Sequence, residues 1–266
     1  MSYHIVVCGS IVPDPLQTLE PLEGPQGWGL KNEMMLPSVL DPWAAHALYE
    51  AANLAKSAPG SQVWLVSIGP KAKLQQVMMT MGQKVPFQLV VMDGPAGGFT
   101  ESWDAAEALA GAIDGIAGLD KSKLLVFGGW QSASRGAGST MQMVGERLGI
   151  LDQFQGVDEL IAVDGGLRVK ERVEGGAYLV STVPSPPAVL GWATGNLPEP
   201  PNNPQVGMQN MRAIMPALQQ AKPAPIGAGG VEYKAVELPK TKRDTRIVKD
   251  VPVDDIAREI VDWIKG

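Results

Sequence analysis

The sequence predicts an α/β fold built on a parallel sheet with helices on its faces. Along the first 150 positions, short apolar runs alternate with segments of helical pattern. Continuous apolar runs are typical of strands buried on both faces, and strands that alternate with helices form right-handed βαβ units. Loops of small residues follow several of these strands, where parallel sheets bind their ligands.

The first half of the chain supplies four βα units in order. Asp41 is the expected N-cap of the first helix, with Pro42 at its first position. The Pro- and Gly-rich stretch 13–37 before it is expected to be a long irregular connection. The apolar periodicity predicts strands over 4–8, 62–67, 87–92 and 123–127, and helices over 42–56, 71–81, 101–117 and about 140–148.

Shorter strands follow over 157–163, 167–173 and 177–183. Apolar and charged residues alternate in 167–173, so this strand is expected to be half exposed, and the turn after it predicts a small added hairpin region. Residues 187–192 are expected to return to the main sheet. The sequence therefore predicts a nucleotide-binding α/β domain over 1–195 that includes the hairpin.

The remaining residues, 196–266, are expected to form a partner-docking loop and an extended C-terminal arm. Residues 198–231 are rich in proline and are expected to be irregular. An amphipathic helix is predicted over 253–265, with Ile256, Ile260 and Ile264 on one face. This tail has too little core of its own, so we expect it to lie against a partner subunit.

Composition restricts the classes of function. A net charge of −6 argues against nucleic-acid binding, which needs clustered Lys and Arg. A single cysteine, Cys8, excludes an internal disulfide framework and fits a reducing compartment. No apolar stretch approaches the roughly 20 residues that span a bilayer. The expected location is the bacterial cytoplasm, or the mitochondrial matrix if the chain comes from another source.

The most informative segment is 128–145, which covers a loop and the start of a helix. It follows the strand 123–127 directly and is rich in small and hydroxyl residues. Backbone N–H groups in such a loop, together with the N-terminus of the next helix, can hold a phosphate. A flexible connection is the alternative. Neither a G-x-G-x-x-G after the first strand nor a P-loop is present. The candidate cofactor-binding residues here are Gly128, Gln131, Ser132, Ser134, Arg135, Gly136, Gly138, Ser139 and Thr140.

Two further strand ends meet the same edge of the predicted sheet. Cys8, Gly9 and Ser10 end the first strand, and Ser67, Ile68 and Gly69 end the second; a plain β-to-α turn is equally compatible with the latter. These residues and Asp41 complete the candidate cofactor-binding set. Neither His4 nor His46 has partners spaced for a metal site or an evident nucleophile, so the sequence indicates no catalytic residue and no metal.

Short motifs in a fixed order resemble the beta subunit of electron transfer flavoprotein over nearly the whole chain. The family's Cys-Val-Lys-Gln-Val-Pro-Asp start resembles Cys8-Gly-Ser-Ile-Val-Pro-Asp14, and its Asn-Pro-Phe helix start resembles Asp41-Pro-Trp43. Three more matches are Val66-Ser-Ile-Gly-Pro70, Thr80-Met-Gly-Gln-Lys84 and Pro187-Ala-Val189. The family's fold is a Rossmann-like sheet of the adenine nucleotide alpha-hydrolase type.

This resemblance implies an electron carrier rather than an enzyme. The alpha subunit of the heterodimer would hold most of a redox-active FAD, and this chain would hold AMP or a second FAD. Electrons would pass from a dehydrogenase to a quinone-linked or iron–sulfur acceptor. The family's docking leucine falls near Val206 to Met208. In the loop after 123–127 the family carries acidic residues where this chain has Arg135 and Gly136.

Two alternatives stay open at this level. One is a nucleotide-binding module, for AMP for example, that has no redox role and shares only the fold. The other is a scaffold subunit that pairs with an alpha subunit but leaves its own pocket empty.

Overall fold

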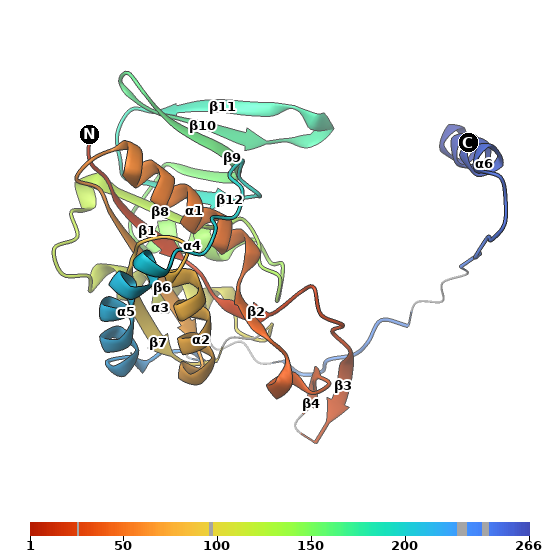
Figure 1. Ribbon diagram of the computed structural model, residues 1–266, viewed down its shortest axis with the longest axis horizontal. Helices are drawn as coiled ribbons and strands as arrows, with labels where there is room; N and C mark the ends of the chain where they lie inside the picture. The colour runs from red at the N-terminus through yellow and green to blue at the C-terminus, as the bar shows by residue number, and fades with distance from the viewer. Residues whose placement is uncertain (26, 96–97, 228–232, 241–244) are drawn as a thin grey trace. The chain divides into compact units, whose positions relative to one another are not determined.

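The computed structural model describes residues 1–25, 27–95, 98–227, 233–240 and 245–266. The chain divides into two compact units, Met1–Glu232 and Tyr233–Gly266. The first unit is an α/β fold with a large, mostly parallel sheet (Figure 1). The predicted fold class is therefore confirmed.

Five parallel strands form the centre of this sheet: β1 (His4–Cys8), β6 (Gln62–Gly69), β7 (Gln88–Asp93), β8 (Leu124–Gly129) and β12 (Ala188–Trp192). Their order is β12-β8-β1-β6-β7, and every residue of β1 is buried. Continuous apolar sequence is what burial on both faces requires. The chain runs from β1 outward to β7 and then crosses back to β8 on the other side of β1, which makes the β1/β8 junction a topological switch point.

One side of the sheet continues with one more parallel pairing and then two antiparallel ones. β9 (Gln153–Val163) lies beside β12, followed by β10 (Gly166–Arg172) and β11 (Tyr178–Val183). The short helical turn η3 (Glu174–Gly176) joins β10 to β11, as the hairpin signal predicted. Leu167 and Val169 are buried while Arg168 is exposed, so the half-exposed strand is confirmed. On the other side, β13 (Lys222–Pro223) pairs with β7.

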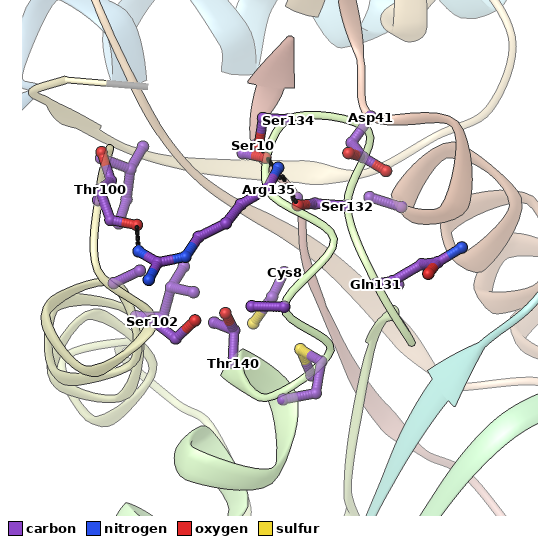
Figure 2. A pocket seen from close by; sticks show the side chains of 18 of the residues that line it. Cys8, Ser10, Asp41, Thr100, Ser102, Gln131, Ser132, Ser134, Arg135 and Thr140 are labelled. Atoms are coloured by element: carbon purple, nitrogen blue, oxygen red, sulfur yellow. Dashed lines mark hydrogen bonds between the residues drawn. The ribbon is translucent and has the colours of Figure 1, made fainter. Parts of the chain in front are cut away.

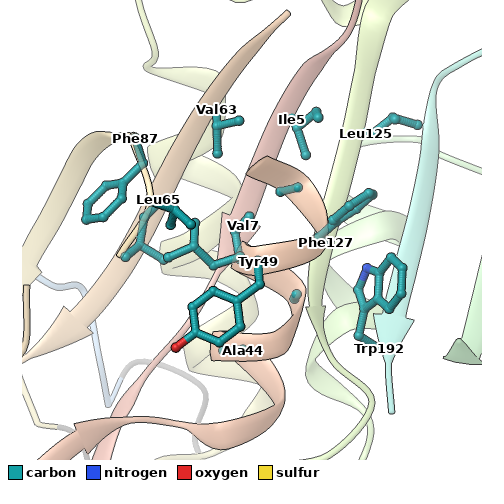
Figure 3. Close-up of a cluster of buried hydrophobic side chains, with 14 of the residues drawn as sticks. Ile5, Val7, Ala44, Tyr49, Val63, Leu65, Phe87, Leu125, Phe127 and Trp192 are labelled. Atoms are coloured by element: carbon teal, nitrogen blue, oxygen red, sulfur yellow. The ribbon is translucent and has the colours of Figure 1, made fainter. Parts of the chain in front are cut away.

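Helices cover both faces of the sheet. α1 (Pro42–Ser57), α2 (Lys71–Gly82) and α5 (Pro204–Gln219) pack on one face, and α3 (Ser102–Asp114) and α4 (Thr140–Arg147) on the other. The turn η2 (Lys121–Lys123) precedes β8. On the first face, Val7, Leu65 and Phe127 of the sheet join Ala44 and Tyr49 of α1 in one apolar cluster (Figure 3).

The irregular connection expected over 13–37 is wrong, because this stretch contains one antiparallel strand pair and a second pair joins its two ends. β2 (Ile11–Pro13) pairs with β5 (Ser38–Leu40), and β3 (Pro21–Gly24) pairs with β4 (Gly27–Leu30). A short helical turn, η1 (Glu33–Met35), follows β4. The proline and glycine content of this segment suggested a loop. Its backbone N–H and C=O groups are instead satisfied in part by pairing between strands.

The irregular stretch expected over 198–231 is also wrong, because it contains α5; its residues 228–231 lie outside the described part. Asn203 caps the helix by accepting from Gln205 N–H at 3.0 Å. Asn210 Nδ2 donates to the carbonyls of Gly82 and Val85 at 2.7 and 2.8 Å. These contacts attach α5 to the end of α2, so the first compact unit extends well past residue 195.

The second unit, taken by itself, contains α6 (Val253–Lys265), whose bounds match the predicted helix. Its apolar residues, among them Ile256, Ile260 and Ile264, are exposed. Arg246 forms an ion pair with Glu259 within this unit. Of the helices that the structure describes, none has both the length and the apolar character to cross a membrane.

Candidate functional site

A pocket opens where the carboxyl ends of β1, β6 and β8 meet (Figure 2). The register places Cys8 beside both Val66 and Gly128, so these strands end at one level. The empty volume of the cavity is about 930 Å³ when the open, solvent-filled mouth is included. It lies at the switch point of the sheet, which is the expected ligand position in this type of fold.

Most of the candidate cofactor-binding residues come together in this pocket, although their role in binding stays a prediction. They come from the ends of β1 and β6, from the loop after β8 with the start of α4, and from the start of α1. The predicted residues that line the pocket are Cys8, Gly9, Ser10, Asp41, Ile68, Gln131, Ser132, Ser134, Arg135, Gly138, Ser139 and Thr140.

Four candidates lie outside the lining: Ser67, Gly69, Gly128 and Gly136. Ser67 is fully buried within the sheet. Gly128 is needed for packing, because a Cβ there would collide with the Met141 side chain. Gly136 has a φ of 66°, a left-handed conformation that favours glycine and lets the loop turn.

The segment between β7 and α3 also contributes to the pocket, although none of its residues was among the predicted candidates. Thr100 from this segment and Ser102 at the start of α3 line the pocket, as does Trp130 after β8. Parallel strands end at one edge of a sheet, so the same rule applied to the strand 87–92 would have pointed to Thr100 and Ser102. The run Gly94-Pro-Ala-Gly-Gly98 that follows this strand is itself rich in small residues and was a readable sequence signal.

Asp41 holds one wall of the pocket in place. One carboxylate oxygen accepts from Trp43 N–H at 3.1 Å and caps α1, while the other accepts from Ala133 N–H at 2.8 Å. The residue is buried. Burial raises the pKa of the Asp41 carboxyl, and the backbone N–H donors oppose that rise.

Ser132 shapes the loop after β8. Its hydroxyl oxygen accepts from the N–H groups of Arg135 and Gly136 at 3.2 and 3.3 Å. The Ser134 hydroxyl lies 3.3 Å from the same oxygen. These local bonds fold the loop into a tight turn that presents Arg135 to the pocket.

The Arg135 side chain extends across the pocket toward the β7–α3 loop (Figure 2). Its Nη1 donates to the Thr100 carbonyl at 3.2 Å and lies 2.9 Å from Glu101 Oε1. The side chains of Arg135 and Glu101 are only 30% and 17% exposed. The ion pair is therefore partly shielded from water and joins two walls of the pocket.

The N-terminus of α4 opens into the pocket through Thr140 and Met141. Its N-cap residue Ser139 makes no side-chain bond to the first turn. The leading N–H groups of a helix carry partial positive charge and bind anions when no side chain caps them. Gly138, with φ of 65°, brings the loop into this helix.

The pocket floor is neutral. Cys8 lies there and is only 5% exposed. Desolvation raises the pKa of its thiol from 9.0 to about 12, so it stays protonated near neutral pH. Cys8 therefore contributes an apolar contact surface rather than a nucleophile.

The predicted docking residues lie on a helix rather than in a loop. Val206 and Met208 belong to the first turns of α5, where Met208 is 65% exposed and Val206 is partly buried. In contrast, Met78 and Met81 of α2 are buried in the core.

The doubly wound sheet and the pocket at its switch point define an α/β protein of the kind that binds ligands at the carboxyl ends of its strands. The electron transfer flavoprotein domain model matches residues 32–226, well over half of the chain. The chain therefore belongs to the electron transfer flavoprotein family, and the predicted family is confirmed. Members of this family are electron carriers associated with flavin. No curated protein gave a significant match.

Proposed function

We propose that this chain is the beta-type subunit of a heterodimeric electron transfer flavoprotein. The family has two kinds of subunit, and the beta assignment rests on the order of the motifs, from Cys8-Gly-Ser-Ile-Val-Pro-Asp14 to Pro187-Ala-Val189. The partner alpha subunit holds most of a redox-active FAD. The exposed apolar residues of α6 and the segment before it suit a C-terminal arm that covers a partner surface.

The pocket holds an adenine nucleotide, either AMP or the adenine-nucleotide half of a second FAD. The observation that carries this proposal is the convergence of Arg135 and the uncapped N-terminus of α4 on one cavity. Both favour a phosphate. The hydroxyls of Ser10, Ser102 and Thr140 add groups that can donate to phosphate oxygens.

A bound flavin would supply the redox chemistry, while this chain binds, orients and shields. The neutral Cys8 thiol and the apolar side chains of Ile68, Leu109 and Met141 form the less polar part of the pocket, which suits a ring system more than a charged group. Asp41 fixes the loop after β8 through Ala133 and keeps this wall in place.

Electron transfer needs a donor and an acceptor outside the heterodimer. We propose a cytoplasmic dehydrogenase as donor and a quinone-linked or iron–sulfur protein as acceptor. The exposed Met208, with Val206 beside it, is the proposed docking anchor for the dehydrogenase. Methionine is flexible and polarisable, and it suits surfaces that accommodate different partners.

Co-expression with a genomically neighbouring alpha subunit tests this function. The expected result is a 1:1 complex with a flavin absorption spectrum. A colourless monomer that never pairs with an alpha subunit would contradict the proposal and favour a nucleotide-binding module. A coloured complex whose stability neither AMP nor FAD raises would instead indicate a scaffold subunit, because a ligand of the native state alone stabilises it.

A further inference from the structure

Arg135 and Glu101 form an ion pair across the pocket in which the proposed function places a phosphate. The pair joins the loop after β8 to the start of α3, and the Arg135 side chain lines the cavity. Cys8, Ser102 and Thr140 lie beside it in the pocket (Figure 2). A nucleotide that enters the pocket therefore meets an Arg135 guanidinium that is already paired with the Glu101 carboxylate.

Within the described lining, charged side chains come from Asp41 and Arg135. Both carboxylate oxygens of Asp41 already accept hydrogen bonds from backbone N–H groups, those of Trp43 and Ala133. Arg135 is thus the side chain that gives this pocket a positive charge. Its guanidinium has several donors and can form paired hydrogen bonds with a phosphate.

We propose that Arg135 selects phosphorylated nucleotides in this pocket, and that the phosphate displaces Glu101 from its guanidinium. This inference rests on the proposed function, since it concerns the ligand of the same site. The 2.9 Å pair keeps Arg135 extended over the cavity in the absence of a phosphate. A phosphate on α4 reaches the same guanidinium from inside the pocket and gains both the helix N-terminus and the cation.

The exchange gives Glu101 a definite effect on affinity. Every phosphate that takes Arg135 must first break its pair with Glu101, so Glu101 lowers the affinity for phosphorylated ligands and leaves unphosphorylated ones untouched. Removing the Glu101 charge therefore strengthens phosphate binding, but only while Arg135 is present. This dependence distinguishes direct exchange from simple repulsion between Glu101 and the phosphate, which persists without Arg135.

Calorimetric titration of the full-length protein, freed of bound nucleotide, with AMP, FAD and adenosine tests the inference. In the wild type, AMP or FAD is expected to bind more tightly than adenosine. Arg135→Gln is expected to weaken the phosphorylated ligand by about tenfold or more, the usual worth of a charge-assisted hydrogen bond. Glu101→Gln is expected to strengthen it severalfold, and the Arg135→Gln/Glu101→Gln double variant to bind like Arg135→Gln.

The Arg147–Glu107 pair supplies the matched control, since it is an Arg–Glu pair that joins α4 to α3 but lies outside the pocket lining. Glu107→Gln is expected to leave all three affinities unchanged. Thermal unfolding of the ligand-free variants verifies that each is folded. Equal AMP affinity in wild type and Arg135→Gln, or a gain from Glu101→Gln that survives in the double variant, would overturn the exchange alone. Failure of the wild type to bind AMP, FAD or adenosine would overturn the nucleotide site itself.

Discussion

The Asp41 carboxylate and the Ala133 N–H group form a 2.8 Å hydrogen bond across 92 positions of the sequence. The same carboxylate caps α1 through Trp43. One buried side chain therefore sets both the start of a helix and the position of the loop after β8. The shape of the pocket depends on this bond, because the residues that follow Ala133 in the loop line it.

Replacing Asp41 with alanine is expected to lower both stability and nucleotide affinity. Losing the cap and leaving Ala133 N–H without its partner should reduce the free energy of unfolding by about 1–3 kcal/mol in urea titrations. Asn203→Ala, which removes the cap of α5, is the control. It should cost about 1 kcal/mol and leave AMP affinity unchanged. Equal AMP affinity in both variants would contradict the role given to Asp41.

Glu50 makes stability depend on pH. Its buried carboxylate accepts from Asn196 N–H at 3.2 Å, and burial raises the pKa of the carboxyl above 4.5. The folded protein thus holds this proton more tightly than the unfolded chain. The stabilising contribution is fully present below pH 4.5 and is lost as the pH rises through the raised pKa.

The uncharged variant Glu50→Gln lacks this dependence. Its melting temperature should therefore rise relative to that of the wild type as the pH increases from about 4 to about 7. Melting curves of both proteins at intervals across this range measure the difference. A difference that stays constant, or that falls with pH, would show that burial does not raise the pKa of Glu50.

Two glycines with different surroundings test the packing around the pocket. A Cβ at Gly129 would lie 2.6 Å from the Gln131 carbonyl oxygen and 2.7 Å from Trp43 Cβ, whereas a Cβ at Gly111 meets nothing within 4 Å. Gly129→Ala should destabilise the protein by about 1–3 kcal/mol, because the backbone must move. Gly111→Ala, within α3, should stabilise it by about 0.5–1 kcal/mol. Chemical unfolding of both variants checks these opposite signs.

Cys8 should resist alkylation in the folded protein. With a pKa of about 12 instead of 9.0, its thiolate fraction at neutral pH is about a thousandfold lower, and burial adds to the protection. Iodoacetamide labelling followed by mass spectrometry reports on this residue alone, because the chain has one cysteine. Rapid labelling is expected once urea unfolds the chain; equally rapid labelling without urea would show that the thiol is neither buried nor protonated.

The parallel sheet was predictable from the sequence because strands buried on both faces consist of continuous apolar residues. In β1 the apolar residues follow one another directly along the chain and are buried, and the same holds for the apolar residues of β8. The prediction was wrong for α5, where Pro204 and Pro216 suggested an irregular chain instead of a helix. The cap Asn203 and the i, i+4 spacing of buried Asn210 and Ile214 were readable signals of a helix.

The candidate site was predictable where one loop carried its own signal and less so where tertiary structure assembled it. Ser132 and Thr140 belong to a loop whose composition is distinctive. Thr100 and Glu101 join them only because β7 lies two strands from β1 in the sheet. That order depends on packing between distant segments, so the Arg135–Glu101 pair had no local sequence signal.

The nucleotide content of the purified heterodimer tests the central claim most directly. Denaturing the complex and quantifying the released nucleotides by chromatography and mass spectrometry gives the number per chain. The account predicts one adenine nucleotide for the pocket of this chain, AMP or FAD, in addition to the FAD of the alpha subunit. Recovery of the alpha subunit's FAD alone, from a complex that also fails to bind added AMP or FAD, would contradict it.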